Sequence, residues 1–193
     1  MGKAARLNAI AKAELLKLDF GCGKNKRPGF TGVDIHPFEG IDQVVDLRGQ
    51  WPWKDASVEE ANASHFIEHL DAWGRVHFFN ELFRVLIPGG KCAIVVPHWA
   101  SNRAYGDPTH QWPPVSEMAM YYLMKGWRTV NAPHTDIAHE PRGYSCDFDA
   151  VWGYSIRGDL NVRNSDYQQY ALANFKEAAQ DMLCTLTKPE KPR

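Results

Sequence analysis

The sequence predicts an α/β fold with an open, mostly parallel sheet. Short apolar or alternating stretches of strand length recur between stretches with helical periodicity. A glycine turn follows the first of them, and "KCAIVVP" at 91–97 is a continuous apolar run, as expected for a strand buried on both faces. Ligands bind beyond the carboxyl ends of the strands in such sheets, so functional residues are expected directly after the predicted strands.

The predicted elements alternate along the chain. The clearest is a helix over 71–86, whose apolar residues recur at helical spacing until Pro88-Gly89-Gly90 ends it. Helices are expected at 3–15, 71–86, 116–124 and 165–179. Strands are expected at 16–20, 32–35, 43–47, 57–64, 91–97, 146–156 and 181–187. No linker divides them, which predicts one domain over residues 1–193.

The composition narrows the class of protein. Hydrophobic residues make up 44% of the chain and charged residues 23%, as in ordinary soluble globular proteins. The formal net charge of −1 excludes the global basic field of a dedicated nucleic-acid binder, although it leaves a local basic groove open. No apolar run is long enough to span a bilayer, so no membrane partner is expected. The sequence does not set the oligomeric state.

The cysteines and the N-terminus favour a cytoplasmic location. Cys22, Cys92, Cys146 and Cys184 lie far apart and form no CxxC pair, so neither a disulfide framework nor a cysteine-rich zinc site is expected. The stretch at 3–17 mixes alanine and leucine with charged residues and lacks the unbroken apolar region of a signal peptide.

The glycine turn in "LDFGCGKNKRPGFTGVDI" (18–35) indicates a cofactor without phosphate groups. A dinucleotide motif wants a third glycine, a helix and an acid about 20 residues further on. Here the third position is Lys26, and only 13 positions separate Gly21 from Asp34, too few for a full crossover helix. A tight turn beside an acid suits a nucleoside, of which S-adenosylmethionine is the common example. A nicotinamide-dependent oxidoreductase is the alternative enzyme.

At these residues the sequence resembles the class I S-adenosylmethionine-dependent methyltransferases. The matching motifs are "LDFGCG" (18–23), "GVDI" (32–35), "VVDL" (44–47), "ASHFIEHL" (63–70) and "ELFRVLIPGGKCAIVVP" (81–97). The match is strong from Leu16 to Pro97 and weak in the last strands, and the usual helix after the first motif is missing. The resemblance implies a Rossmann-like sheet of about seven strands, the last one antiparallel, with helices on both faces.

The resemblance also implies roles for ten cofactor-binding residues. Gly21 and Gly23 would let the backbone approach the methionine part, Asp19 would help to hold the amino group, and Asp34 would bind the ribose hydroxyls. The residues of the adenine pocket and of the sulfonium end follow the third and fourth strands. The ten are Asp19, Gly21, Cys22, Gly23, Asp34, Ile35, Asp46, Leu47, Ser64 and His65. Taken singly, each of these positions also fits a plain turn or a surface acid.

The segment 98–144 is the expected acceptor-recognition insertion, because enzymes of this kind differ there by substrate. Its start, "PHWASNRAYGDPTHQWPP" (97–114), is rich in aromatic and polar side chains that suit a pocket for a small-molecule acceptor. We expect His110 to act on the acceptor, with His98 and Tyr105 as the other catalytic candidates. The alternative is a loop that only covers the sheet edge.

Two histidine clusters raise the question of a metal. "HFIEH" at 65–69 matches the H-x-x-E-H zinc signature, which needs both histidines on one face of a long helix. Here the motif follows a strand, and "HTDIAHE" at 134–140 fits a solvated loop, so no metal is expected. A non-catalytic protein that kept the fold for binding is the alternative from another class, since fold does not guarantee chemistry.

Overall fold

The computed structural model describes residues 15–191, so the helix expected over 3–15 lies outside them apart from its last position. The strands are β1 (Leu16–Phe20), β2 (Thr31–Asp34), β3 (Gln43–Val44), β4 (Val58–Ser64), β5 (Leu86–Pro97), β6 (Asp149–Ile156) and β7 (Ala179–Thr187). The helices are η1 (Ile67–His69), α2 (Ala72–Val85), α3 (Arg103–Gly106), α4 (Glu117–Tyr122), α5 (Lys125–Asn131), η2 (Asp136–Ala138), α6 (Gly158–Asn161) and α7 (Ser165–Asn174).

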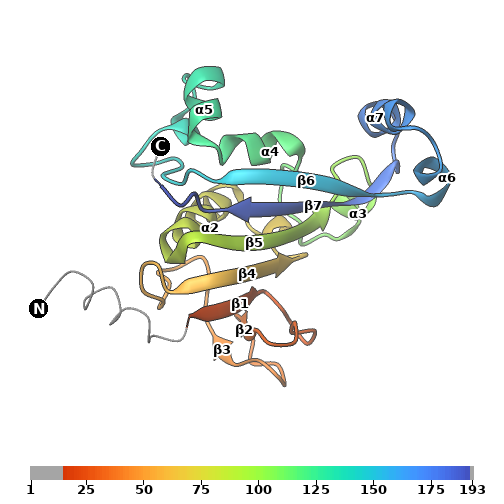
Figure 1. The fold of residues 1–193 in the computed structure, drawn as a ribbon. Coiled ribbons are helices and arrows are strands. Elements are labelled where there is room, and N and C mark those ends of the chain that lie inside the picture. Colours follow the sequence, from red (N-terminus) through yellow and green to blue (C-terminus); the bar gives the residue numbers. More distant parts are fainter. Residues whose placement is uncertain (1–14, 192–193) are drawn as a thin grey trace, which may run out of the picture.

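The seven strands form one sheet in the order β3-β2-β1-β4-β5-β7-β6. Strands β1 to β5 pair in parallel, whereas β7 runs antiparallel to both of its neighbours, β5 and β6. This confirms the predicted Rossmann-like α/β sheet with an antiparallel last strand. The carboxyl ends of β1, β4 and β5 point to one side of the molecule, on the right in Figure 1, together with α3.

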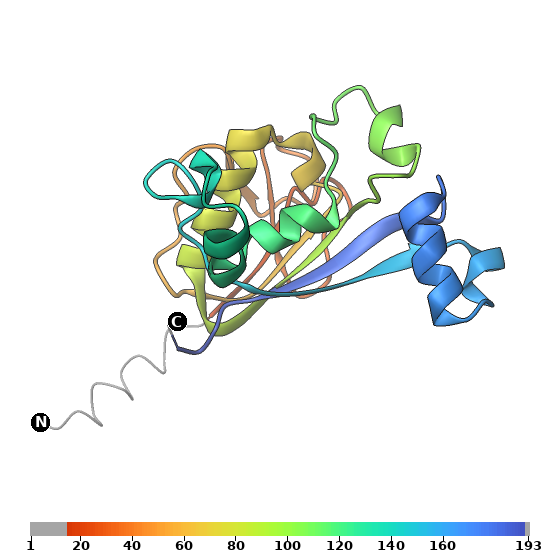
Figure 2. The same ribbon diagram turned by 90° about the horizontal axis from the view of Figure 1, so that it is seen from above.

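One face of the sheet carries the hydrophobic core. Side chains with no exposed surface lie side by side across four strands, at Leu18, Ala61, Cys92 and Leu186. Helix α2 and the α4–α5 part of the 98–144 segment cover this face, and apolar side chains of α2 and Met120 of α4 join the same core. Figure 2 shows α2, α4 and α5 on the same side of the strands, with α6 and α7 beyond the end of the sheet.

The opposite face carries the alternating partners of these residues. The next row across the sheet runs through Asp19, Asn62, Ala93, Thr185 and Val151. Along this row the exposed fraction rises from 2% at Asp19 to 73% at Val151, so residues 15–191 leave the β6 side of this face open. The prediction of helices on both faces is therefore confirmed for one face of the described part only.

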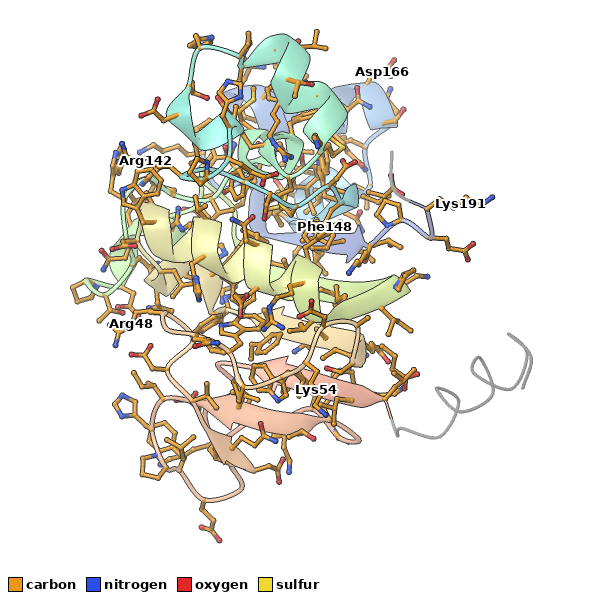
Figure 3. All side chains as sticks on the ribbon, turned by 90° about the vertical axis from the view of Figure 1, so that its left-hand side faces the viewer. Arg48, Lys54, Arg142, Phe148, Asp166 and Lys191 are labelled. Carbon is orange, nitrogen blue, oxygen red and sulfur yellow. The ribbon has the colours of Figure 1, made fainter. Side chains whose placement is uncertain are left out.

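Helix α2 follows its predicted span closely because its ends are specified locally. The Asp71 side chain accepts a hydrogen bond of 2.6 Å from the Gly74 N–H, which caps the first turn. The helix buries Val76, Phe79 and Leu82 at helical spacing. Next to the helix, the ring of Phe148 lies 5.0 Å from that of Phe83, centroid to centroid, at an angle of 90° (Figure 3).

The C-terminal elements differ from the sequence prediction at their ends. Helix α7 ends at Asn174, where 179 was expected, and β7 begins at Ala179, where 181 was expected. Glu177 adopts a left-handed φ of +60°, which a helix cannot continue. Strand β6 begins at Asp149 instead of 146, and β3 spans only Gln43–Val44.

Among residues 15–191, no helix has the length and apolarity needed to cross a membrane.

Because the core lies on one face of the sheet, a Val→Ala substitution should lower the free energy of unfolding more on that face than on the other. Val96 has no exposed surface, so Val96→Ala should lower the free energy of unfolding by about 2 kcal/mol through lost burial and a residual cavity. Val151→Ala, on the open face, should change it by less than about 0.5 kcal/mol. Urea denaturation of both variants checks this, and an equal loss at Val151 would contradict an open face.

Candidate functional site

A cavity of about 620 Å³ lies where β1, β2 and β4 end. Its position is the one expected for a ligand site in an open α/β sheet. Six of the ten predicted cofactor residues line it: Gly21, Asp34, Ile35, Asp46, Leu47 and His65. Seven more lining residues were not predicted: His36, Phe38, Val45, Arg48, Phe66, His69 and Leu70. His36, Arg48 and Phe66 directly follow a predicted residue, and the other four lie within five positions of one, so closeness to the strand ends is the signal that points to them.

Asp34 joins the glycine turn to the exit of β2. One carboxylate oxygen accepts a hydrogen bond of 2.9 Å from the Gly23 N–H, and the other accepts one of 3.0 Å from the His36 N–H. The side chain is 9% exposed and faces the cavity. Each carboxylate oxygen has further lone pairs, so Asp34 can accept two more hydrogen bonds from a ligand.

The two glycines of the turn have different reasons to be glycine. Both adopt left-handed backbone conformations, with φ of +61° at Gly21 and +51° at Gly23. A Cβ on Gly21 would lie 2.1 Å from a ring carbon of Phe66, so this position is closed by packing. A Cβ on Gly23 would meet nothing within 4 Å, which leaves the space beside it open to a ligand.

Four predicted cofactor residues do not line the cavity: Asp19, Cys22, Gly23 and Ser64. Asp19 is 2% exposed and accepts hydrogen bonds of 2.7 Å from the Arg27 N–H and 2.6 Å from the Asn62 side chain. Its carboxylate thus fixes the loop between β1 and β2. Burial raises the pKa of the Cys22 thiol, and Ser64 is exposed at the end of β4.

The far end of the cavity combines an apolar wall with one ion pair. Leu47 is buried, while Ile35 and Phe38 are partly exposed, which leaves apolar surface available to a planar ring. Arg48 donates two hydrogen bonds of 2.9 and 2.8 Å to Asp46, and this guanidinium lowers the pKa of Asp46 to about 2. Arg48 lies at the periphery of the molecule (Figure 3).

The near end of the cavity is formed by the exit of β4 and by η1. His65 adopts a φ of +53°, and its Nδ1 atom lies 3.3 Å from Glu68 Oε1. This carboxylate raises the pKa of His65. Arg75, on α2, is buried and donates to the carbonyls of Ile67, Glu68, Gln111 and Pro113, which fastens η1 to the 98–114 loop.

The three catalytic candidates occupy different places. His98 has no exposed surface, and its Nε2 lies 3.3 Å from Glu117, so it packs inside the protein and does not reach the cavity. Tyr105 is 55% exposed and lines a separate cavity of about 140 Å³. His110 does lie beside the main site, because its ring contacts that of His69, a lining residue, at a centroid distance of 4.8 Å.

Comparison with known proteins bears on the fold. No protein-family model and no curated protein matches this sequence. A SAM-dependent methyltransferase from Archaeoglobus fulgidus is similar over 95% of this chain and 92% of its own, with a TM-score of 0.61 and 19% sequence identity. A second one, from Methanosarcina mazei, is similar over 96% of this chain and 98% of its own, with a TM-score of 0.56 and 15% identity.

A third solved structure is the geranyl diphosphate C-methyltransferase from Streptomyces coelicolor, in complex with Mg²⁺, geranyl diphosphate and S-adenosyl-L-homocysteine. It is similar over 96% of this chain and 77% of its own, with a TM-score of 0.53 and 12% identity. Likeness at these identities establishes the fold. The chain has the fold of the class I S-adenosylmethionine-dependent methyltransferases, as the sequence motifs predict.

Because the two glycines have different surroundings, replacing each with alanine should lower the free energy of unfolding by different amounts. Gly23→Ala should lower the free energy of unfolding by about 1 kcal/mol, the cost of a left-handed alanine. Gly21→Ala should cost a further 1–3 kcal/mol or so, because the new Cβ overlaps the Phe66 ring. Urea denaturation of the two variants measures the difference. Equal losses would show that the Phe66 contact does not constrain the turn.

Proposed function

We propose that the protein is an S-adenosylmethionine-dependent methyltransferase with a small-molecule acceptor. The observation that carries this proposal is the cavity of about 620 Å³ in which Asp34 faces the ligand space beside a glycine turn. The fold supports the same activity, since solved structures with this architecture are described as S-adenosylmethionine-dependent methyltransferases. The protein would work in the cytoplasm, which its four free cysteines support.

The residues present fit this cofactor part by part. The free lone pairs of Asp34 suit the two ribose hydroxyls, because its two protein hydrogen bonds already hold the carboxylate in place. The apolar surface of Ile35, Phe38 and Leu47 suits the adenine ring. His65 and Phe66 at the other end would then lie toward the sulfonium. When bound, the cofactor supplies an electrophilic methyl group.

The nicotinamide alternative is less well supported. A dinucleotide places its pyrophosphate on the N-terminus of the helix that follows the glycine turn. In this chain the turn leads through an irregular loop into β2 at Thr31, without a helix in between. Asp34 is therefore available to a ribose, but no helix N-terminus receives phosphate at the glycine turn.

In methyl transfer the main task of the protein is to position the acceptor and the cofactor. The acceptor's lone pair attacks the methyl carbon in line with the departing sulfur, and the leaving group is a neutral thioether that needs no acid. A base is useful only where the acceptor must lose a proton. We propose that the 98–144 segment recognises the acceptor, because its loop lies against η1 at the near end of the cavity.

Replacing Asp34 tests the cofactor site directly. Asp34→Ala removes a pair of charge-assisted hydrogen bonds to the ribose, so the affinity for S-adenosylmethionine should fall at least about tenfold. Isothermal titration calorimetry measures the change. Asp34→Asn keeps an acceptor oxygen but loses the charge, and should give an intermediate loss.

The matched control is Asp166→Ala, at the start of α7 and far from the cavity, which should bind as the parent does. The melting temperature of each variant shows whether the loss is local, because Asp34 also holds two backbone N–H groups. Unchanged binding by a folded Asp34→Ala variant would refute the proposed site. Tighter binding of NAD than of S-adenosylmethionine by the parent would favour the oxidoreductase instead.

A further inference from the structure

A cluster of three potential metal ligands lies beside the cavity. Glu68, His69 and His110 each offer one ligand atom, and the three atoms lie within 4.8 Å of one another. They come from two distant parts of the chain: Glu68 and His69 from η1, and His110 from the loop after α3. His69 also lines the 620 Å³ cavity, so the cluster opens toward the ligand space.

The Glu68 carboxylate is paired only with His65 among residues 15–191, and that contact is not a hydrogen bond. The residue is 4% exposed, and neither carboxylate oxygen has a hydrogen-bond partner among the described residues. His65 Nδ1 comes within 3.3 Å of Oε1, but the contact lacks hydrogen-bond geometry. A buried carboxylate is costly without enough compensating positive charge, and a bound cation would add to the single partner that His65 provides.

The hydrogen bonds of His69 fix its tautomer. Thr109 Oγ1 lies 2.9 Å from His69 Nδ1 and 2.7 Å from the Asp107 carboxylate. A carboxylate oxygen accepts, so the Thr109 hydroxyl donates its proton to Asp107. The hydroxyl oxygen must then accept from His69 Nδ1–H. The lone pair of His69 is therefore on Nε2.

His110 has the same tautomer, which is fixed by a different partner. Its Nδ1 lies 3.3 Å from the Ala104 carbonyl oxygen, which can only accept, so Nδ1 carries the proton and Nε2 carries the lone pair. Both imidazoles thus donate from Nδ1 to the protein and keep the lone pair on Nε2, with the Nε2 atom of His110 also 3.9 Å from Asp107 Oδ2. This is the arrangement in which second-shell partners hold metal-ligating histidines.

We propose that Glu68, His69 and His110 bind a divalent first-row transition cation such as Zn²⁺ or Mn²⁺. Two imidazoles and one carboxylate make up known catalytic zinc sites and the facial triad of non-haem iron. Bonds of about 2.1 Å at tetrahedral angles would place ligand atoms roughly 3.4 Å apart. The three atoms now lie within 4.8 Å of one another, so binding would draw them closer together.

The site differs from the zinc motif considered in the sequence. In H-x-x-E-H both histidines of the motif are ligands, whereas here His65 is left out and His110 takes its place. His110 therefore receives a different role from the one expected from the sequence, since an imidazole that holds a metal through Nε2 has no lone pair left to accept a proton. The competing explanation is a proton shared within the cluster in place of a metal.

An ion held by three protein ligands keeps an open coordination position, and here His69 places that position toward the cavity. If the proposed methyltransferase function holds, on which this step rests, the acceptor is a molecule with an oxygen that can bind a cation, such as a hydroxyl compound. The cation would orient that oxygen and lower the pKa of a hydroxyl.

Metal binding can be measured without any acceptor. Chelator-treated protein is titrated calorimetrically with ZnCl₂ and MnCl₂, and one ion should bind per chain. Glu68→Gln, His69→Ala and His110→Ala should each weaken binding by roughly 100-fold or more, since even a second-shell loss costs about 10–100-fold. Thr109→Val, which removes only the hydroxyl that holds His69, should fall within that second-shell range.

The matched control is His139→Ala, because His139 is exposed and lies in the other histidine cluster, with its Nε2 next to the Pro133 carbonyl. It should bind metal as the parent does. No binding by the parent, or equal binding by the parent and the His110→Ala variant, would overturn the proposal. If the Glu68→Gln variant does not fold because Glu68 is buried, the His69→Ala and His110→Ala variants still test the metal site.

Titration of the metal-free protein with S-adenosylmethionine separates the two proposals. Cofactor binding without metal binding would sink the metal site and leave the methyltransferase intact. Metal binding that depends on the three ligands, in a chain that binds no S-adenosylmethionine, would keep the site and sink the proposed function.

Discussion

A single buried guanidinium holds the two halves of the site together. Arg75 donates to the carbonyls of Ile67 and Glu68 on one side and to those of Gln111 and Pro113 on the other. The carbonyls of Ile67 and Glu68 also accept from backbone N–H groups, so Arg75 adds a donor that both segments share. Because Gln111 N–H also donates to the Glu68 carbonyl at 2.8 Å, the loop that carries His110 is fixed against η1 by backbone contacts. The chemistry at the near end of the cavity therefore depends on Arg75, which touches no ligand.

The sequence was enough to predict the sheet and its cofactor edge. Strand periodicity and the order of the motifs placed Asp34, Asp46 and His65 at strand exits, and all three line the cavity. The ends of α7 and β7 could not be predicted, because the break between them depends on Glu177, whose carboxylate accepts from the Asn102 N–H more than 70 positions away. Tertiary contacts of this kind leave no local pattern.

The burial of His98 follows from the alternation of side chains along β5. Cys92, Ile94 and Val96 face the core, and His98 continues the same alternation, so it points inward with them. His110 and the pair Glu68–His69 were each visible in the sequence. The contact between them could not be predicted, because it depends on the fold of a long irregular segment and on the carbonyl groups that accept hydrogen bonds from Arg75.

The open face of the sheet has a consequence for how stability varies with temperature. A sheet packed on one face hides less apolar surface than one packed on both, and the heat-capacity change of unfolding grows with the apolar surface that becomes hydrated. A small heat-capacity change flattens the stability curve. For the architecture of residues 15–191 we therefore expect stability to vary less with temperature than in a domain of the same length whose sheet is packed on both faces.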